Sequence, residues 1–340
     1  MSIPNPEKRL YFKNLVASRW INIGRKIENI EVKSILVVKL DEFGDMANAT
    51  HVFEILKSQY PMAELTLLCK GFLKPLLVND PNIDKIITSE DDWNKKYEVV
   101  VELRGTEGTL KKSFEYKPNF RVDRGTVRFR NRGNQKQEVY TNHEIIMPLI
   151  SDLECVPPKI YLGKANRENA ENFKERIERK KYVVMHAGAR RELRKWKEDN
   201  FARICKSLVE ERGMHVVLAG GKEDIDTNKR IQVLAGVNVH LMPEGNSLLD
   251  FAAVVEGAVL FIGNESGPMH IASCMGVPII GLFGPGVKNV FYPFSKKAIV
   301  LHHILECNPC DQIHCIYPEN TCMDRIEVED VKIAIDRLIG

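Results

Sequence analysis

An aspartate preceded by a glycine stands in the segment KLDEFGDMANAT, residues 39–50, which directly follows an expected buried strand at 34–38. In open α/β sheets, ligands bind beyond the carboxyl ends of the strands. In that position Asp45 could take a proton from an incoming hydroxyl, and Gly44 permits a tight turn ahead of it. Alternatively, Asp45 only caps the following helix. The glycine spacing is not GxGxxG, so no dinucleotide fingerprint is expected here.

A second segment, MHAGARRELRKW at residues 185–196, follows an expected strand at 182–185 and concentrates positive charge. Phosphate oxygens are the natural partners of such a group of cations. Because Gly188 accompanies them at a strand's carboxyl end, phosphate binding is the preferred interpretation over a solvated basic loop. The cations are Arg190, Arg191, Arg194 and Lys195.

A third segment, FIGNESGPMHIASCMGVPIIGLFGP at residues 261–285, predicts a strand, the start of a helix and a second strand. Glu265 and Ser266 are capping residue types, and Pro268 suits the first turn of a helix. The free N–H groups at such a helix start form an anion site suited to a diphosphate. A plain helix cap would explain Ser266 alone, but not why the second strand also ends in a glycine-rich loop at Gly284.

Four of the eight cysteines crowd into sixteen positions with the pattern C-x2-C-x4-C-x6-C. Four thiolates at this spacing could hold Zn²⁺ or iron tetrahedrally as a structural staple, with His314 as a spare ligand. The alternatives are reduced thiols packed in a loop, or one or two disulfides. The four are Cys307, Cys310, Cys315 and Cys322, whereas Cys69, Cys155, Cys205 and Cys274 stand among apolar neighbours and are expected to be small core residues.

The net charge of the chain is only +3, but the segment 104–136 holds ten Lys and Arg against three acidic residues, a local net of +7. Clustered cations focus potential on one face, so this segment could form a platform for an acidic substrate. The alternative is a solvated, flexible loop. A nucleic-acid interface is not expected, because no recognisable binding module accompanies the charge. From this segment we take Arg121, Arg124 and Arg128, with Gly44, as candidate acceptor-binding residues.

An amphipathic helix is predicted at residues 8–27, ahead of the first strand. Its apolar stripe carries a tryptophan and its other positions are basic, which is typical of helices in a membrane interface. It could equally dock on its own domain or on a second subunit. The stripe is Phe12, Val16, Trp20, Ile23 and Ile27, and the cations are Lys8, Arg9, Lys13, Arg19, Arg25 and Lys26.

These segments must be positioned by a parallel α/β scaffold, because short β-branched runs alternate with amphipathic stretches almost throughout. The 340 residues suggest two domains, and a composition of 44% apolar and 28% charged residues is that of an ordinary globular protein. No run is long enough to span a bilayer, and the first ten residues lack a secretory signal, so cytoplasm is the expected location. Strands are expected at 34–38, 65–69, 99–103, 182–185, 215–219, 258–262 and 277–283, and helices at 46–59, 166–180, 199–211, 247–256, 268–275 and 327–338.

Together the three loops resemble glycosyltransferase family 9, the heptosyltransferases of lipopolysaccharide core assembly, in the right order from about residue 34 to the C-terminus. The resemblance implies a GT-B fold, in which two Rossmann-like doubly wound domains face an interdomain cleft. It places an acceptor site in residues 34–165 and a nucleotide-sugar donor site in residues 166–325, with the Cys-rich tail. Residues 1–33 are then a helical extension, and 326–340 a helix across the domain junction.

The resemblance also implies inversion at the anomeric carbon without a catalytic metal, with ADP-heptose as donor and a lipopolysaccharide core or similar acidic glycan as acceptor. Asp45 matches the family's general base, and Arg194 its basic residue before the tryptophan, with Lys195 beside it. Donor-binding positions would include the diphosphate turn and a histidine of the same helix, which could instead be structural. They are Gly188, Arg190, Glu223 or Asp224 near the ribose, Asn246, Ser247 and Leu248 near the adenine, and Glu265, Ser266, Gly267, Pro268 and His270.

Departures from the family pattern concern the acceptor more than the reaction. The run MANAT after Asp45 and the arginine at position 194 differ from the residues frequent there. Relatives that modify proteins have similar Cys-rich tails that hold iron, so a protein-type heptosyltransferase with a four-cysteine metal site is one alternative. A non-catalytic nucleotide-sugar-binding module and a nucleic-acid protein with a zinc knuckle are the others.

Overall fold

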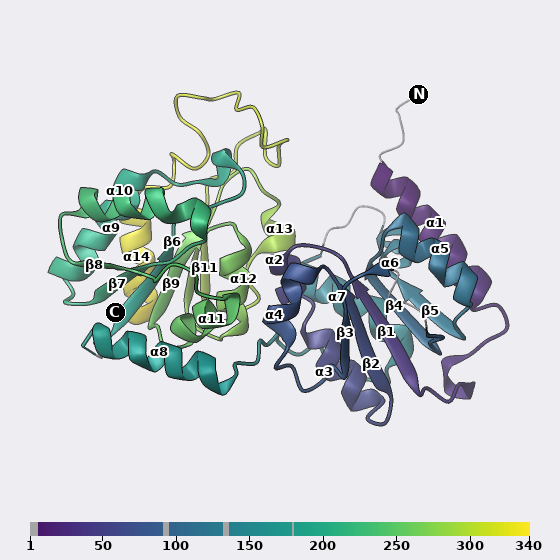
Figure 1. The fold of residues 1–340 in the computed structure, drawn as a ribbon. Helices are drawn as coiled ribbons and strands as arrows, with labels where there is room; N and C mark the ends of the chain where they lie inside the picture. The colour runs from purple at the N-terminus through teal and green to yellow at the C-terminus, as the bar shows by residue number, and fades with distance from the viewer. Residues whose placement is uncertain (1–5, 91–94, 132–135, 179) are drawn as a thin grey trace. The chain divides into compact units, whose positions relative to one another are not determined.

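The structure is a computed structural model that describes residues 6–90, 95–131, 136–178 and 180–340. The chain divides into two compact units, Met1–Tyr161 and Leu162–Gly340 (Figure 1). Each unit is built around one parallel sheet, of five and six strands respectively, so the predicted doubly wound α/β class is confirmed. None of the helices described is long and apolar enough to cross a membrane.

The sheet of the first unit has the strand order β3-β2-β1-β4-β5, and every neighbouring pair is parallel. Its central strand β1 is buried along its whole length, as expected for a parallel strand covered by helices on both faces. The expected strands at 34–38, 65–69 and 99–103 are confirmed, and two shorter edge strands were not foreseen. The bounds are β1 Ser34–Lys39, β2 Glu64–Cys69, β3 Lys85–Ile87, β4 Val99–Arg104 and β5 Phe120–Asp123.

Short helices follow these strands. The single helix expected at 46–59 is two, α2 and α3, because the chain turns at Asn48–Thr50. The basic segment 104–136 is not a flexible loop in its described part, since it forms α5, β5 and α6. The bounds are α2 Phe43–Ala47, α3 His51–Gln59, α4 Lys74–Leu77, α5 Glu107–Tyr116, α6 Arg124–Arg130 and α7 Glu138–Ile146, with 3-10 turns η1 Ile27–Asn29, η2 Gly71–Leu73 and η4 Met147–Leu149.

The N-terminal helix α1, Pro6–Ile21, docks on its own unit against α6, β5 and α5. It buries the face that carries Leu15, Ala17 and Ile21, and it lies so close to α6 that a Cβ at Gly125 would sit 2.3 Å from the Tyr11 carbonyl oxygen. The predicted apolar stripe is not the docking face. Its members Phe12, Val16, Trp20 and Ile23 are all exposed, Trp20 by 70%.

The sheet of the second unit has the order β11-β10-β9-β6-β7-β8 and is also parallel throughout. All four strands expected here are confirmed, whereas the edge strands β8 and β11 were missed. The strands are β6 Tyr182–His186, β7 His215–Leu218, β8 Val239–Leu241, β9 Leu260–Asn264, β10 Ile279–Phe283 and β11 Ala298–His302.

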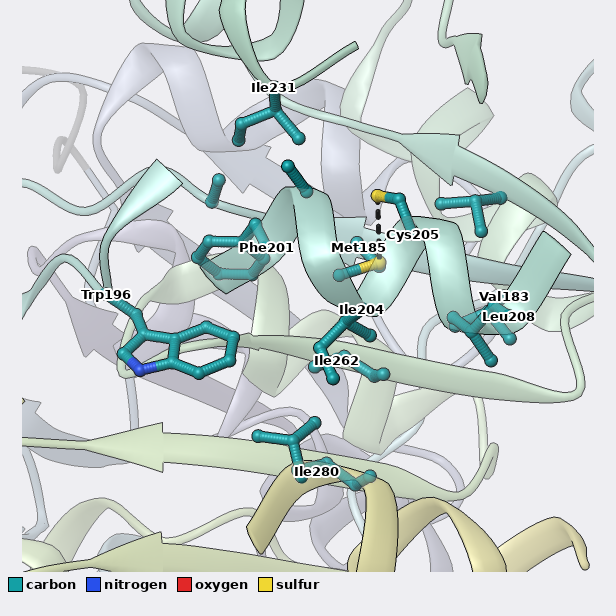
Figure 2. Close-up of a cluster of buried hydrophobic side chains, with 14 of the residues drawn as sticks. Val183, Met185, Trp196, Phe201, Ile204, Cys205, Leu208, Ile231, Ile262 and Ile280 are labelled. Atoms are coloured by element: carbon teal, nitrogen blue, oxygen red, sulfur yellow. Dashed lines mark hydrogen bonds between the residues drawn. The ribbon is translucent and has the colours of Figure 1, made fainter. Parts of the chain in front are cut away.

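Helices cover both faces of this sheet, with α9, α10 and α14 sharing one core with the strands. In that core Trp196 lies edge-on to Phe201 at 5.2 Å, and Cys205 contacts Met185 (Figure 2). The helices are α8 Lys164–Arg176, α9 Glu198–Glu210, α10 Ile225–Ala235, α11 Leu248–Glu256, α12 Gly267–Cys274, α13 Lys288–Phe291 and α14 Val328–Ile339, with 3-10 turns η5 Glu192–Arg194 and η6 Lys222–Asp224.

The C-terminal helix α14 packs within the second unit, on α9, β10 and β11. Its apolar residues Val331, Ala334 and Ile335 belong to the same hydrophobic core as Trp196 and Phe201. The indole N–H of Trp196 donates to the Ile326 carbonyl at 2.8 Å, just ahead of the helix. A contact of α14 with the domain junction stays a prediction.

Candidate functional site

Asp45 lies in α2, just beyond the carboxyl end of β1, and is half-buried. Burial raises the pKa of its carboxyl group; Asp41 and Glu138 act in the same sense, and Lys39 and Arg104 oppose them. No side chain caps α2, so the alternative that Asp45 serves as a helix cap gains no support. Among the described residues, no hydrogen bond or ion pair engages this carboxylate, which leaves it open to a substrate hydroxyl.

A buried ion-pair network lies beside Asp45. The Lys39 ammonium is 2.9 Å from an Asp41 carboxylate oxygen and 3.9 Å from one of Glu138, and Arg104 reaches the other Asp41 oxygen at 2.8 Å. Burial acts against ionisation of Glu138, yet Arg124 and then Lys39 hold the pKa of that carboxyl at about 2. Glu138 therefore stays ionised at neutral pH, and the ion pairs join β1, β4 and α7 beside Asp45.

The acceptor candidates divide into buried and accessible residues. Arg121 is completely buried, where its guanidinium donates to the Asn14 carbonyl at 3.1 Å and to the Ser18 hydroxyl at 2.7 Å. These contacts hold α1 in place, and the buried guanidinium is not accessible to an acceptor. Arg124 is also buried, in a two-point contact with Glu138 whose second distance is 2.9 Å.

The remaining acceptor candidates lie closer to Asp45 or are accessible to solvent. Gly44 is buried in α2, next to Asp45. Arg128 stays partly exposed, with its guanidinium 3.6 Å from Glu138. A cavity between α1 and the carboxyl ends of β4 and β5 adds a half-exposed cation that we did not single out in the sequence, Arg104. The available signal was its position directly after the expected strand at 99–103, as the first residue of the basic segment 104–136.

Four adjacent strands of the second unit, β9, β6, β7 and β8, carry the donor candidates at their carboxyl ends. His186, the last residue of β6, joins two of the loops: its ring lies 3.4 Å from an Asp224 oxygen and 3.3 Å from the Ser266 hydroxyl. Burial opposes ionisation of Asp224, but the His186 ring holds the pKa of its carboxyl below the ordinary value. A Cβ at Gly188 would lie 2.1 Å from Asp224. The glycine thus lets this buried carboxylate sit against the β6 loop.

The two acidic residues proposed near a ribose therefore differ. Asp224 is buried and accepts a hydrogen bond from the Gly221 amide at 3.0 Å, so its role is to shape the turn. Glu223 is exposed in the same 3-10 turn and is the one available to a ligand. In the next loop Asn246 and Ser247 are exposed, and the Ser247 hydroxyl caps α11 by accepting from the Asp250 amide at 3.1 Å.

The start of α12 is left without a side-chain cap. Ser266 is its N-cap residue, but the Ser266 hydroxyl donates to the Asn264 carbonyl at 3.0 Å instead of accepting from the helix. The simple capping role is therefore not what Ser266 does here, and the first turn of an eight-residue helix keeps N–H groups for an anion. Gly267 and Pro268 are half-buried in this turn, and His270 is buried one turn further on.

Glu265, directly before this turn, is 2% exposed. Burial raises the pKa of its carboxyl to about 7, and Arg194, at 3.3 Å, opposes that shift. The Arg194 side chain also donates from Nε to Gln312 at 2.6 Å. Arg194 is therefore held by two partners, while Lys195 pairs with Glu192 at 2.7 Å and Arg190 is exposed.

The four clustered cysteines line one cavity together with His314 and Asn308. None of the eight cysteines, all of which lie in the described part of the chain, forms a disulfide. Burial raises the pKa of the Cys322 thiol, and the thiols of Cys315, Cys310 and Cys307 raise it further. The four groups therefore interact electrostatically. A tighter group of possible metal ligands lies elsewhere in the described residues. It consists of His51, His143 and Cys155, whose ligand atoms all lie within 4.8 Å of one another.

The cysteine segment is connected to the donor loops. Asn308 donates to the Gly284 carbonyl at 3.1 Å, and the Cys310 amide donates to the Pro285 carbonyl at 3.3 Å. Gln312, between the second and third cysteine, is the partner of Arg194. Sequence reasoning missed Gln312 and His186, because their partners are far away along the chain.

Comparisons with known proteins agree with this architecture. The family model described as glycosyltransferase family 9 (heptosyltransferase) matches residues 107–320. The chain is similar to lipopolysaccharide heptosyltransferase 1 of Campylobacter coli, with 21% identity over 90% of this chain and 99% of that protein. The solved structure of a family 9 glycosyltransferase from Veillonella parvula shares its fold, with a TM-score of 0.77, 20% identity and coverage of 90% and 97% of the two chains.

Two further structures share the fold. ADP-heptose lipopolysaccharide heptosyltransferase II of Escherichia coli matches with a TM-score of 0.72 and 19% identity, over 90% of this chain and 98% of that one. The iron-containing dodecameric glycosyltransferase TibC of enterotoxigenic E. coli matches with a TM-score of 0.57 and 14% identity, over 90% and 76% of the chains. The predicted GT-B architecture is thereby confirmed.

Proposed function

The chain belongs to glycosyltransferase family 9, the heptosyltransferase family, and we propose that it transfers heptose from ADP-heptose, with inversion, to a lipopolysaccharide core or similar glycan. The observation that carries the proposal is the half-buried Asp45 carboxylate, which has a raised pKa and no hydrogen-bond or ion-pair partner among the described residues. A base with these properties suits the removal of a proton from an acceptor hydroxyl during attack. Similarity to lipopolysaccharide and ADP-heptose heptosyltransferases supports this choice of donor and acceptor.

In the proposed mechanism, Asp45 takes the proton of the acceptor hydroxyl as its oxygen bonds to the anomeric carbon. The bond from that carbon to the diphosphate breaks in the same step, which inverts the anomeric centre. The charge on the leaving ADP is met by Arg194, Lys195 and the uncapped first turn of α12. No metal ion takes part in these steps.

Donor binding is assigned to the loops at the carboxyl edge of the second sheet. Arg190, Ser266, Gly267, Pro268 and His270 would receive the diphosphate and sugar. We assign the ribose contact to the exposed Glu223, with Asp224 and Gly188 shaping the turn. The loop at Asn246, Ser247 and Leu248 would lie near the adenine.

On the acceptor side, Gly44, Arg128 and the cavity-lining Arg104 are the proposed contacts. Their cations would meet acidic groups of the glycan. The exposed stripe of α1 and of the turn that follows it, defined as Phe12, Val16, Trp20 and Ile23, would rest on an anionic lipid surface, with the exposed Lys8, Arg9, Arg19 and Lys26 beside it. The enzyme would then work in the cytoplasm, peripherally on the inner membrane.

We also propose that Cys307, Cys310, Cys315 and Cys322 hold a structural zinc or iron ion. The fit rests on four free thiols lining one cavity, although they are less tightly gathered than ligands around an ion. The TibC structure with the same fold is described as iron-containing. Such an ion would stiffen the segment that carries Gln312 and, through it, Arg194.

The test of the proposed function is Asp45→Asn. Its transfer rate should fall by about 10²–10⁴-fold, the range of general base catalysis, while the dissociation constant for ADP stays within twofold, because the donor loops are in the other unit. The matched control is Asp152→Asn, an exposed position whose left-handed backbone also suits asparagine. An Asp45→Asn variant that keeps full transfer would refute the role of Asp45. A wild type without any turnover would favour a non-catalytic binding module.

A further inference from the structure

A buried histidine in the first unit lacks the partners that such a side chain needs. His51 is the first residue of α3 and is 1% exposed. Neither ring nitrogen makes a well-aligned hydrogen bond in the described part of the chain, although the backbone carbonyls of Asn48 and Val139 lie close to the ring. Burial, followed by the neighbouring His143, lowers the pKa of His51 to about 3, so the ring is neutral. A neutral imidazole still carries one N–H, and leaving it unsatisfied costs about 1–3 kcal/mol.

Two other donors face this ring. His143, on α7, lies nearly parallel to it, with ring centroids 6.4 Å apart and an interplanar angle of 27°, and its Nδ1 is also without a hydrogen-bond partner among the described residues. The third donor is Cys155, a free thiol in the segment that leads to the second unit. One atom from each residue lies within 4.8 Å of the other two. Three segments distant in sequence thus bring two imidazoles and a thiol together.

We propose that His51, His143 and Cys155 form a structural site for one Zn²⁺ ion, separate from the cysteine cluster of the second unit. Three donors at the corners of a triangle of this size lie about 2.8 Å from its centre, whereas zinc bonds are about 2.0–2.3 Å. A movement well below 1 Å per side chain therefore closes the site. Water would complete the tetrahedron.

The donor set favours zinc over hard cations. Imidazole and thiolate are borderline to soft ligands, and no carboxylate belongs to the group. Cys155 would bind as the thiolate and release one proton for each ion taken up. Zinc-bound histidines usually donate their second N–H to a carbonyl or carboxylate, and the Asn48 and Val139 carbonyls lie close enough to His51 to interact with its ring.

The site would fasten the elements around the proposed base. His51 begins α3 directly after the Asp45 helix α2, and α7 already holds this turn through a hydrogen bond from Asn142 to the Asn48 carbonyl at 3.1 Å. The connecting segment is tied to the same place, because the Lys159 amide donates to the Thr50 hydroxyl at 3.1 Å. A zinc ion would join α3, α7 and this segment covalently.

The experiment compares zinc content after chelation and dialysis against Zn²⁺, measured by plasma mass spectrometry on the folded full-length chain. Wild type should hold one more equivalent of zinc than Cys155→Ser and than His143→Gln. The matched control Cys274→Ser, at another half-buried cysteine, should equal wild type. Equal zinc content in wild type and both site variants would overturn the proposal.

Cobalt provides a second readout, in a chain that lacks the four clustered cysteines of the second unit. With Cys307, Cys310, Cys315 and Cys322 all changed to serine, Co²⁺ should still bind with one equivalent and give a thiolate-to-cobalt charge-transfer band, which Cys155→Ser removes. Absence of that band in the four-serine chain would contradict the site. If the four-serine chain fails to fold, the zinc difference between wild type and Cys155→Ser decides.

Discussion

Glu265 sits at the junction of the donor loops with both carboxylate oxygens buried and without hydrogen-bond partners among the described residues. Because its folded-state pKa is about 7, the folded chain keeps a proton that the unfolded chain releases above about pH 4.5. The free energy of unfolding should therefore fall as pH rises from 4.5 to 7, by up to about 3 kcal/mol from this group.

Glu265→Gln should remove this pH dependence. Urea unfolding at pH 5 and pH 8 should show the variant gaining stability relative to wild type at the higher pH. The control is Glu244→Gln, an exposed carboxylate, which should leave the difference between the two pH values unchanged. The same slope in wild type and Glu265→Gln would show that Glu265 is ionised throughout this range.

The positions of individual residues were predictable where a loop motif follows a buried strand, as for Asp45 after β1 and Ser266 after β9, whereas their roles stay predictions. Residues were not predictable where a distant partner decides the role. The charge of its segment made Arg121 a candidate acceptor-binding residue, but its guanidinium donates hydrogen bonds to Asn14 and Ser18, about a hundred positions earlier. Adding up charge along a segment gives no sign of such pairing.

The helix α1 shows the same limit at the scale of an element. Its periodic apolar stripe suggested a docking face, yet the helix buries Asn14 and Ser18 together with small and branched apolar residues. The buried guanidinium of Arg121 forms ion pairs with Glu102 on β4 and Asp123 on β5. Its remaining N–H groups need the polar partners that α1 provides. The strands were easier, because short continuous apolar runs rich in β-branched residues favour buried parallel strands.

Arg121→Met should destabilise the chain by about 3–5 kcal/mol, since it leaves Glu102 and Asp123 buried without their cation. Urea unfolding should show the loss, and α1 should become susceptible to limited proteolysis. Arg130→Met, on the exposed end of α6, is the control and should change stability by less than about 0.5 kcal/mol. A loss below 1 kcal/mol for Arg121→Met would mean that the guanidinium does not hold α1.

The exposed stripe of α1 predicts binding to vesicles that contain anionic lipid. Phe12→Ser combined with Trp20→Ser should weaken the partition into such vesicles by about tenfold or more, because each side chain buries apolar surface in the interface. Met62→Ser, another strongly exposed apolar residue of the same unit, should have no effect. Equal partition of all three proteins in a sedimentation assay would remove the lipid contact from the proposal.

At the scale of the whole molecule, the alternation of strands and helices was sufficient to predict two parallel α/β units. The edge strands β3, β5, β8 and β11 were missed because they are only three to five residues long and carry little periodic signal. That the loops with the donor candidates lie at one edge of the second sheet was predictable, since the carboxyl ends of neighbouring parallel strands share one edge. Their internal supports, His186 and Gln312, depend on tertiary contacts.

Heptose transfer from ADP-heptose is measured most directly as the mass gained by the acceptor in mass spectrometry. Purified enzyme is incubated with ADP-heptose and a lipopolysaccharide core acceptor, with UDP- and GDP-sugars as parallel donors. The acceptor should gain one heptosyl group from ADP-heptose alone, with one ADP released per transfer. An unchanged acceptor, together with no release of ADP and no rise of the unfolding midpoint in excess ADP, would contradict heptose transfer from ADP-heptose.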